Sequence, residues 1–158
     1  MNVFIDTINK LNQNVNEVPQ NILKFPEQEL SFKPKPEKWS KKEILGHLCD
    51  SAVNNLSRFI RVQFESEPFV VNSYMQDDWV KVNHYQEMKM SDVIELWSVL
   101  NKRIIDVVSK IPGDKLAIEV DTGGAAYREI DGKKTLLWLI EDYLMHMEYH
   151  LKQLGIGN

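Results

Sequence analysis

Apolar residues recur at helical spacing in four segments of the chain. The first covers roughly residues 2–18, the second runs from residue 41 to about Phe64, the third from Ser91 to just before Pro112, and the fourth from near Thr135 to Gly155. In each segment the apolar positions lie three or four residues apart, which places them on one face of a helix. Four long helices with two substantial crossover connections predict an all-α fold, a four-helix bundle, for a single domain over residues 1–158.

The connections between these segments differ in character. Residues 19–36 are rich in proline, and within this passage residues 32–36 are expected to be extended rather than helical. Residues 65–90 form a long connection with short helical turns expected near Asp77–Tyr85. Residues 116–134 alternate weakly in polarity and contain Gly123-Gly124, which predicts a small hairpin or an irregular loop before the last helix.

The clearest helix start lies at the second segment. Ser40 and Glu43 have the spacing of a capping box, in which the serine side chain accepts from a backbone N–H and the glutamate side chain accepts from the cap residue. Trp39 and Ile44 occupy the positions of a hydrophobic staple. Gly46 costs only about 1 kcal/mol relative to alanine and does not end the helix.

Composition narrows the class of protein. The chain has 158 residues, 43% hydrophobic and 27% charged, with a formal net charge of -4. This balance favours neither nucleic acid nor an anionic membrane surface as a partner. No apolar run is long enough to span a bilayer, and the N-terminus lacks the features of a signal peptide. Cys49 is the one cysteine, which excludes an internal disulfide and a cysteine-rich zinc site. A cytoplasmic protein is expected.

His146 and His150 lie four residues apart in the fourth segment. On a helix this spacing is a rise of roughly 6 Å and a rotation of about 40°, so both imidazoles can reach one metal ion. The two histidines flank the core-facing apolar stripe, where ligands can point into a cavity between helices. A histidine with a purely structural hydrogen bond also occurs at such a boundary, so the pair alone leaves both interpretations open.

His47 belongs to a polar stripe along the second segment. The other members of this stripe, all within about 40° of His47 on a helical wheel, are Glu43, Asp50, Ser51, Asn54, Arg58 and Arg61. The stripe is either a solvent-facing side of the helix or the lining of a pocket, and periodicity does not decide between them. Glu43 is the weakest candidate ligand, because the capping box already engages its side chain.

Two further residues with reactive side chains are expected outside this site. Cys49 lies about 200° from His47 on the wheel, so a buried, hydrophobic role is expected for it. His84 falls in the long connection before the third segment, where a structural or pocket-lining role is expected.

Two motifs resemble the DinB/YfiT-like superfamily. Residues 38–48, Lys-Trp-Ser-Lys-Lys-Glu-Ile-Leu-Gly-His-Leu, followed by Asp50-Ser51, are similar to its helix-two signature, in which a Trp-Ser cap leads into a helix with the first metal histidine. Residues 146–154 are similar to its last-helix motif, which carries two more histidines. Residues 76–80 and Tyr85 resemble the loop between its second and third helices. The resemblance spans nearly the whole chain.

The resemblance implies a DinB-like bundle in which His47, His146 and His150 hold one divalent metal ion. Zinc and nickel are the ions expected first. All three positions are intact in this sequence. It also implies a homodimer, since family members often dimerise. Some members are similar to thiol S-transferases that use low-molecular-weight thiols such as bacillithiol and mycothiol. Others resemble metal-dependent hydrolases.

Three hypotheses for function follow. Three imidazoles leave open positions on an ion, so a small-molecule thiol bound there could attack an electrophile, with Asp50, Asn54 and Arg58 as candidate catalytic residues. Arg58 would orient a substrate carboxylate. The same site could hydrolyse a substrate with an ion-activated water and Asp50 as base. Alternatively, the metal-bound bundle binds a small molecule or a partner without turnover.

Overall fold

The structure is a computed structural model of the chain and describes residues 2–128 and 133–157. Its α-helices are α1 Val3–Ile22, α2 Glu27–Ser31, α3 Lys41–Arg61, α4 Gln76–Val82, α5 Met90–Val108 and α6 Leu136–Gln153. The connections contain two 3-10 helices, η1 Tyr85–Glu87 and η2 Gly113–Ala117. They also contain three short strands, β1 Phe69–Val70, β2 Glu119–Asp121 and β3 Lys134–Thr135.

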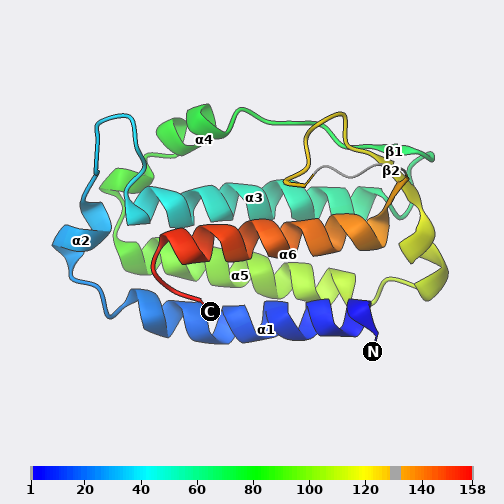
Figure 1. Cartoon of the computed structure of the whole chain (residues 1–158), viewed down its shortest axis with the longest axis horizontal. Coiled ribbons are helices and arrows are strands. Elements are labelled where there is room, and N and C mark those ends of the chain that lie inside the picture. The colour runs from blue at the N-terminus through cyan, green and yellow to red at the C-terminus, as the bar shows by residue number, and fades with distance from the viewer. Residues whose placement is uncertain (1, 129–132, 158) are drawn as a thin grey trace.

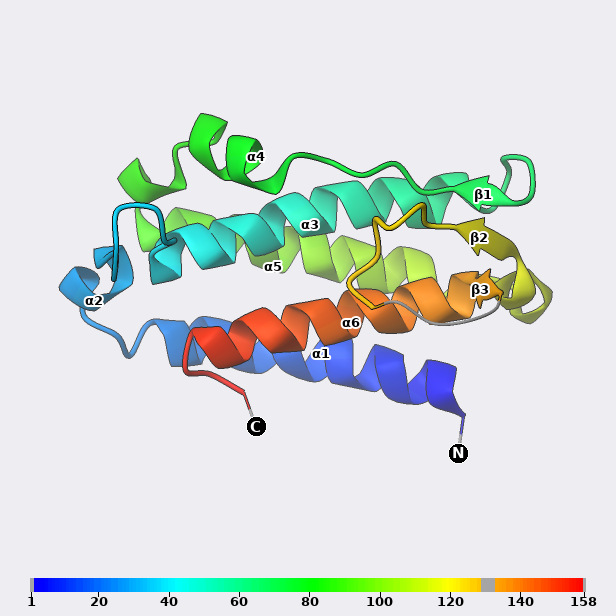
Figure 2. The same cartoon turned by 45° about the horizontal axis from the view of Figure 1, so that its top comes forward.

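Four long helices form the bundle that the apolar periodicity predicts (Figure 1). α3 packs against α5 and α6, and α1 packs against the same two helices. Figures 1 and 2 show that α3 and α5 run in one direction and α1 and α6 in the opposite one. Because α3 and α5 are parallel neighbours, the connection that contains α4 must return along the whole bundle. The second long connection joins α5 and α6 at one end of the bundle, so only one of the two predicted crossovers runs its length.

The first helix is longer than the sequence pattern predicts. The expected end was near residue 18, ahead of the proline-rich passage, but α1 continues through Pro19 to Ile22. Pro19 removes one backbone hydrogen bond from the last turn. Val18 and Ile22 are buried on the core-facing side, and their burial offsets that loss. Residues 27–31, just before the segment expected to be extended, form the short helix α2, which the sequence pattern did not predict.

The third long helix begins one residue before its expected start. The sequence pattern predicts a start at Ser91, but the helix begins at Met90, and Lys89 is the cap residue without a side-chain cap hydrogen bond. The Ser91 hydroxyl donates instead to the Asp92 carboxylate at 3.1 Å. Met90 is buried, so core packing rather than capping sets this end.

The short strands form one three-stranded sheet in the order β1-β2-β3. β2 and β3 pair antiparallel, as the hairpin expected within residues 116–134 requires. The parallel pairing of β1 with β2 was not expected from the sequence. It ties the connection after α3 to the connection before α6, and so places both over the same end of the bundle.

Each of the four long helices contributes fully buried side chains to one core. Leu11 of α1, Leu45 of α3, Trp97 of α5 and Ile140 of α6 have no exposed surface. None of the described helices combines the length and the apolar character that crossing a membrane requires.

Candidate metal centre

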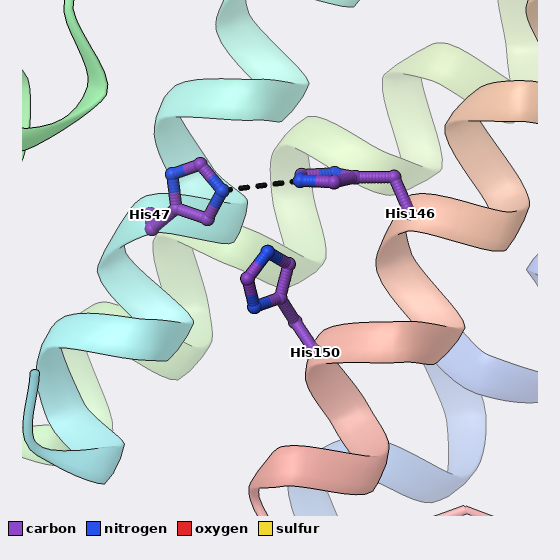
Figure 3. A group of neighbouring side chains, drawn as sticks. All are labelled: His47, His146 and His150. Carbon is purple, nitrogen blue, oxygen red and sulfur yellow. Dashed lines mark hydrogen bonds between the residues drawn. The ribbon is translucent and has the colours of Figure 1, made fainter. Parts of the chain in front are cut away.

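Three histidine rings from two helices converge between α3 and α6 (Figure 3). His47 comes from α3, and His146 and His150 come from successive turns of α6. Their candidate ligand nitrogens all lie within 4.8 Å of one another. The Nε2 atoms of His47 and His146 are 3.1 Å apart. Two nitrogens bound to one tetrahedral zinc ion would be roughly 3.3 Å apart, so this spacing fits a shared ion.

Hydrogen bonds at the other ring nitrogen orient two of the histidines. Nδ1 of His150 lies 2.8 Å from Oε1 of Gln153, so an Nδ1–H donated there leaves Nε2 available to an ion. Gln153 in turn donates to the Tyr149 hydroxyl at 3.0 Å. Nδ1 of His146 lies 3.4 Å from the Ser51 hydroxyl. Outer hydrogen bonds of this kind fix the tautomer and the direction of metal-binding imidazoles.

The environment of the rings favours the neutral form that metal binding needs. His47 has no exposed surface and His150 is 9% exposed. Burial lowers the pKa of His47 and of His146 to about 3, and the charge of His150 acts in the same direction. Burial also lowers the pKa of His150, against a hydrogen bond with Gln153. Three neutral imidazole donors in one buried cluster fit a divalent ion.

Trp39 covers the cluster on the side of the α3 start. Its ring lies 4.8 Å from the ring of His47 and 6.5 Å from that of His150, between centroids. The indole therefore shields the two histidines from water, and its position depends on how α3 begins.

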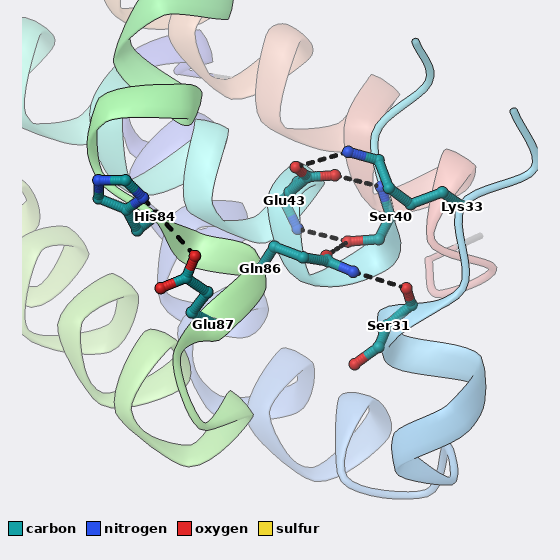
Figure 4. A network of polar contacts seen from close by, with 7 residues as sticks. All are labelled: Ser31, Lys33, Ser40, Glu43, His84, Gln86 and Glu87. Carbon is teal, nitrogen blue, oxygen red and sulfur yellow. Dashed lines mark hydrogen bonds and ion pairs between the residues drawn. The ribbon is translucent and has the colours of Figure 1, made fainter. Parts of the chain in front are cut away.

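A polar network fixes the start of α3 (Figure 4). The predicted capping box is confirmed, since Glu43 N–H donates to the Ser40 hydroxyl and Ser40 N–H donates to the Glu43 carboxylate. Lys33 pairs with the second carboxylate oxygen of Glu43 at 2.9 Å. Gln86 of η1 accepts from the Ser40 hydroxyl and donates to the Ser31 carbonyl. The network thus joins α2, α3 and η1 and holds Trp39, the next residue before the cap, beside the histidines.

Two cavities adjoin the histidine cluster. The outer one has a volume of about 780 Å³ and is lined by Trp39, Tyr149 and His150 together with the loop before α3. The inner one has a volume of about 300 Å³ and extends from His146 and His150 to Arg58. Tyr149 and His150 line both cavities, so the cluster lies where the two meet.

Part of the polar stripe of α3 faces the inner cavity and not solvent. Ser51 and Arg58 of the stripe, together with the neighbouring Asn55, are buried and line this cavity. Burial lowers the pKa of the Arg58 guanidinium, although the nearby Asp142 carboxylate acts against this. Arg61, at the end of the stripe, pairs with Glu65 at the surface at 2.6 Å. The stripe is therefore part pocket lining and part surface.

Asp50 and Asn54 do not belong to the lining of either cavity. The Asp50 carboxylate accepts from the Tyr85 hydroxyl at 2.6 Å and from the Asn83 amide at 2.9 Å, and burial raises its pKa to about 6. The Asn54 side chain donates to the Asp50 carbonyl. Among the three candidate catalytic residues, the structure thus places Arg58 in a cavity that also reaches the histidines and engages Asp50 with the connection after α4.

Sequence reasoning missed Asp142 and Tyr127. Asp142 lies one turn before His146 on the same face of α6, and its carboxylate accepts from the backbone N–H groups of Tyr127 and Arg128, each at 2.8 Å. This contact places the Tyr127 ring 5.6 Å from the ring of His146. The spacing of four residues between Asp142, His146 and His150 was a usable signal for the acid. No sequence signal pointed to Tyr127.

The remaining candidates lie outside the cluster. Cys49 is fully buried, as expected, and burial raises the pKa of its thiol. His84 has a left-handed backbone conformation with φ 53° and an exposed side chain 3.9 Å from the Glu87 carboxylate. Figure 4 shows it beside Glu87 at η1. His84 is therefore a surface residue.

The fold and the cluster together define a class: four-helix bundles with a three-histidine site between two helices. The sequence profile of the DinB superfamily matches residues 11–154, and the chain belongs to this superfamily. Among solved structures, YfiT from Bacillus subtilis is similar, with a TM-score of 0.70 and 16% sequence identity over 98% of this chain and 89% of that chain. YfiT is described as a probable metal-dependent hydrolase with an unusual four-helix bundle topology. No curated protein sequence matches the chain.

Proposed function

We propose that the chain is a metal-dependent enzyme that transfers a small-molecule thiol to an electrophile, with His47, His146 and His150 as the ligands of one zinc or nickel ion. One observation carries the proposal: three imidazoles, two buried and one partly buried, converge within 4.8 Å at the junction of two cavities. A purely structural site is closed by its protein ligands, whereas three ligands leave a position for substrate.

The donor set fits several divalent metals, since imidazole suits zinc, copper, iron and nickel. Zinc and nickel are proposed because the resemblance to the DinB superfamily implies them, and three histidine nitrogens suit either ion. An ion bound there would supply Lewis acidity, which lowers the pKa of a bound thiol or water.

The residues around the cluster have distinct roles in this proposal. Gln153 holds the tautomer of His150 by accepting its Nδ1–H. Trp39 and Tyr127 cover His47 and His146 from different sides and exclude water. Exclusion of water strengthens electrostatic interactions at the site and protects a thiolate from competing protonation.

The arrangement of carboxylates supports thiol transfer over hydrolysis. A thiol that coordinates a metal is deprotonated without a separate base, whereas hydrolysis usually relies on a positioned base. Asp50, the base considered from the sequence, lines neither cavity. Asp142 lines the inner cavity, but both its oxygens accept hydrogen bonds from the segment Tyr127-Arg128. Two cavities that share His150 also allow the thiol and the electrophile to approach from different sides.

A metal-dependent hydrolase is the second candidate, and the structural similarity to YfiT favours it. In that case the candidate bases are Glu37 and Asp77, the two acidic residues among the described residues that line the outer cavity. The hydrolase would use the outer cavity and the transferase would use both cavities, and the two candidates can be separated by substrate.

Turnover assays on the same preparations test both candidates. We expect zinc- or nickel-loaded protein to consume a thiol from a panel of low-molecular-weight thiols in the presence of monochlorobimane, and chelated protein not to do so. Hydrolysis is followed in parallel with p-nitrophenyl esters and anilides. His150→Ala should abolish the activity, and His84→Ala, at the surface histidine, should keep it.

The outcomes separate the hypotheses. Metal-dependent thiol consumption without ester or amide cleavage supports the transferase, and the reverse supports the hydrolase. If neither thiol nor ester nor anilide is consumed with any metal, the enzyme proposal is wrong, and the bundle binds its ligand without turnover.

A further inference from the structure

Arg58 is a buried cation at the end of the inner cavity away from the histidines. It is 8% exposed. Its guanidinium donates to two uncharged oxygens, the Asn72 carbonyl at 2.6 Å and the Asn55 side chain at 3.2 Å. Within residues 2–128 and 133–157, no acidic group lies within ion-pair distance of it. A buried charge is costly unless an opposite charge compensates it, so this position is suited to an anionic ligand group.

The acid whose charge acts on Arg58, Asp142, is paired with other groups. Its Oδ2 accepts from the Tyr127 N–H, and its Oδ1 accepts from both the N–H and the side chain of Arg128, the latter at 3.1 Å. Arg128 is therefore the ion-pair partner of Asp142. Among the described residues that line the inner cavity, Arg58 is thus a cation without an ion-pair partner.

The shape of the inner cavity sets the kind of molecule that can reach Arg58. On α3 its lining runs from Ser51, beside His146, to Arg58. These positions are seven residues apart, which is roughly 10 Å along a helix. Its walls include the rings of Tyr74, Tyr127 and Tyr143. Polar residues such as Ser51 and Asn55 line it as well, so the cavity of about 300 Å³ fits a short, narrow molecule with one charged end.

We propose that this cavity binds a small-molecule monocarboxylate whose carboxyl group pairs with Arg58. The planar guanidinium matches a carboxylate in geometry and in charge. A phosphate group would bring a second negative charge toward Asp142, which disfavours it. The inference rests on the proposed function in one respect: the far end of the bound molecule lies at the histidines, so the carboxylate belongs to the electrophilic substrate.

Calorimetric titration of the metal-free protein in excess chelator tests the binding site without any need for activity. The probes are hexanoate, its uncharged counterpart hexanamide, and inorganic phosphate. We expect hexanoate to bind at least about tenfold more tightly than either of the other two, because only hexanoate combines one negative charge with an apolar body. Arg58→Gln should weaken hexanoate binding by about tenfold or more.

Arg61→Gln is the matched control, because Arg61 lies one turn further on the same helix and pairs with Glu65 at the surface. Its affinity for hexanoate should equal that of the wild type. In case Arg58→Gln does not fold, the Nε–Hε NMR signal of Arg58 in the wild-type protein is followed during the titration and should shift at saturation.

Three results would each overturn the inference: no hexanoate binding below roughly 10 mM, equal binding of hexanoate and hexanamide, or an Arg58 signal that does not move. Tighter binding of phosphate than of hexanoate would contradict the carboxylate assignment. Because the titration needs no metal, a failure here leaves the metal proposal standing, and a failure of metal binding leaves this titration interpretable.

Discussion

Gly46 lies at the point where Tyr85 packs on α3. A Cβ atom built at this position would overlap the Tyr85 ring, and the Tyr85 hydroxyl continues to the Asp50 carboxylate. The sequence indicated only that a glycine here was tolerable within a helix. The structure indicates that any larger side chain would displace η1 from α3.

Gly46→Ala therefore separates helix propensity from packing. Propensity alone predicts a gain of about 1 kcal/mol in the free energy of unfolding. The overlap with Tyr85 predicts a loss of about 1–3 kcal/mol, as for other overpacked positions, and urea unfolding of the metal-free protein measures the sign. Ser57→Ala, at an exposed position of α3, is the control and should change stability by less than about 0.5 kcal/mol. A more stable Gly46→Ala variant would contradict the close contact.

The raised pKa of the Asp50 carboxyl group predicts that the stability of the fold depends on pH. Burial raises its pKa from 3.8 to about 6 in the folded protein, so between these values the folded state binds more protons than the unfolded state. The stabilisation from this proton is present at low pH and is lost as pH rises through about 6. The difference in free energy of unfolding between the wild type and Asp50→Asn should thus fall by up to about 3 kcal/mol from pH 4 to pH 7.

Urea unfolding across this range, with chelator present, measures that difference. The histidines titrate in both proteins, so their contribution cancels. A difference that stays constant, or that rises with pH, would contradict the raised pKa.

At the scale of single residues, the sequence predicted the three histidines and left the polar stripe undecided. The histidines were predictable because both the helical spacing and the family resemblance can be recognised in short, local motifs. Whether the stripe is buried depends in part on residues 125–127, which line the same cavity as Arg58 and are distant in sequence. Asp142 escaped notice because an acid at the edge of an apolar stripe resembles an ordinary surface residue.

Among the elements, the contact between α6 and the segment after β2 is the one that shapes the inner cavity. Asp142 holds the backbone of Tyr127 and Arg128, and this segment brings Ala125, Ala126 and Tyr127 to the cavity wall. A carboxylate can accept from both N–H groups at once, whereas an amide offers a single acceptor oxygen.

Asp142→Asn should therefore release this segment. We expect faster amide hydrogen exchange at Tyr127 and Arg128 and a loss of about 1–3 kcal/mol in the free energy of unfolding, because a buried hydrogen-bonded charge is removed. Glu141→Gln, at the preceding position of α6, is the control and should leave the exchange of both amides unchanged. Unchanged exchange in Asp142→Asn would show that other contacts hold the segment.

The bounds of the long helices were predictable within a few residues, because apolar periodicity and capping residues are local signals. The end of α1 beyond Pro19 was not, since it depends on the burial of Ile22 against other helices. The pairing of β1 with β2 was not predictable either. Two-residue strands have little pattern of their own, and contacts distant in sequence decide their partners.

For the whole molecule, the bundle was predictable but the order of its helices was not. Four amphipathic segments specify four packed helices, whereas the sequence does not specify which helix lies diagonal to which. The structure places α6 beside α3, and this neighbour relation brings His47 to a pair of histidines that is about a hundred residues away. The candidate metal centre is thus a product of topology as well as of motif.

The stoichiometry of metal binding tests the central claim most directly. Protein purified without a histidine tag and loaded with zinc or nickel should contain about one ion per chain by elemental analysis, as one three-histidine site requires. His146→Ala combined with His150→Ala should remove this ion, and His84→Ala should keep it, because His84 is a surface residue outside the cluster. An unchanged metal content in the double variant would contradict the account.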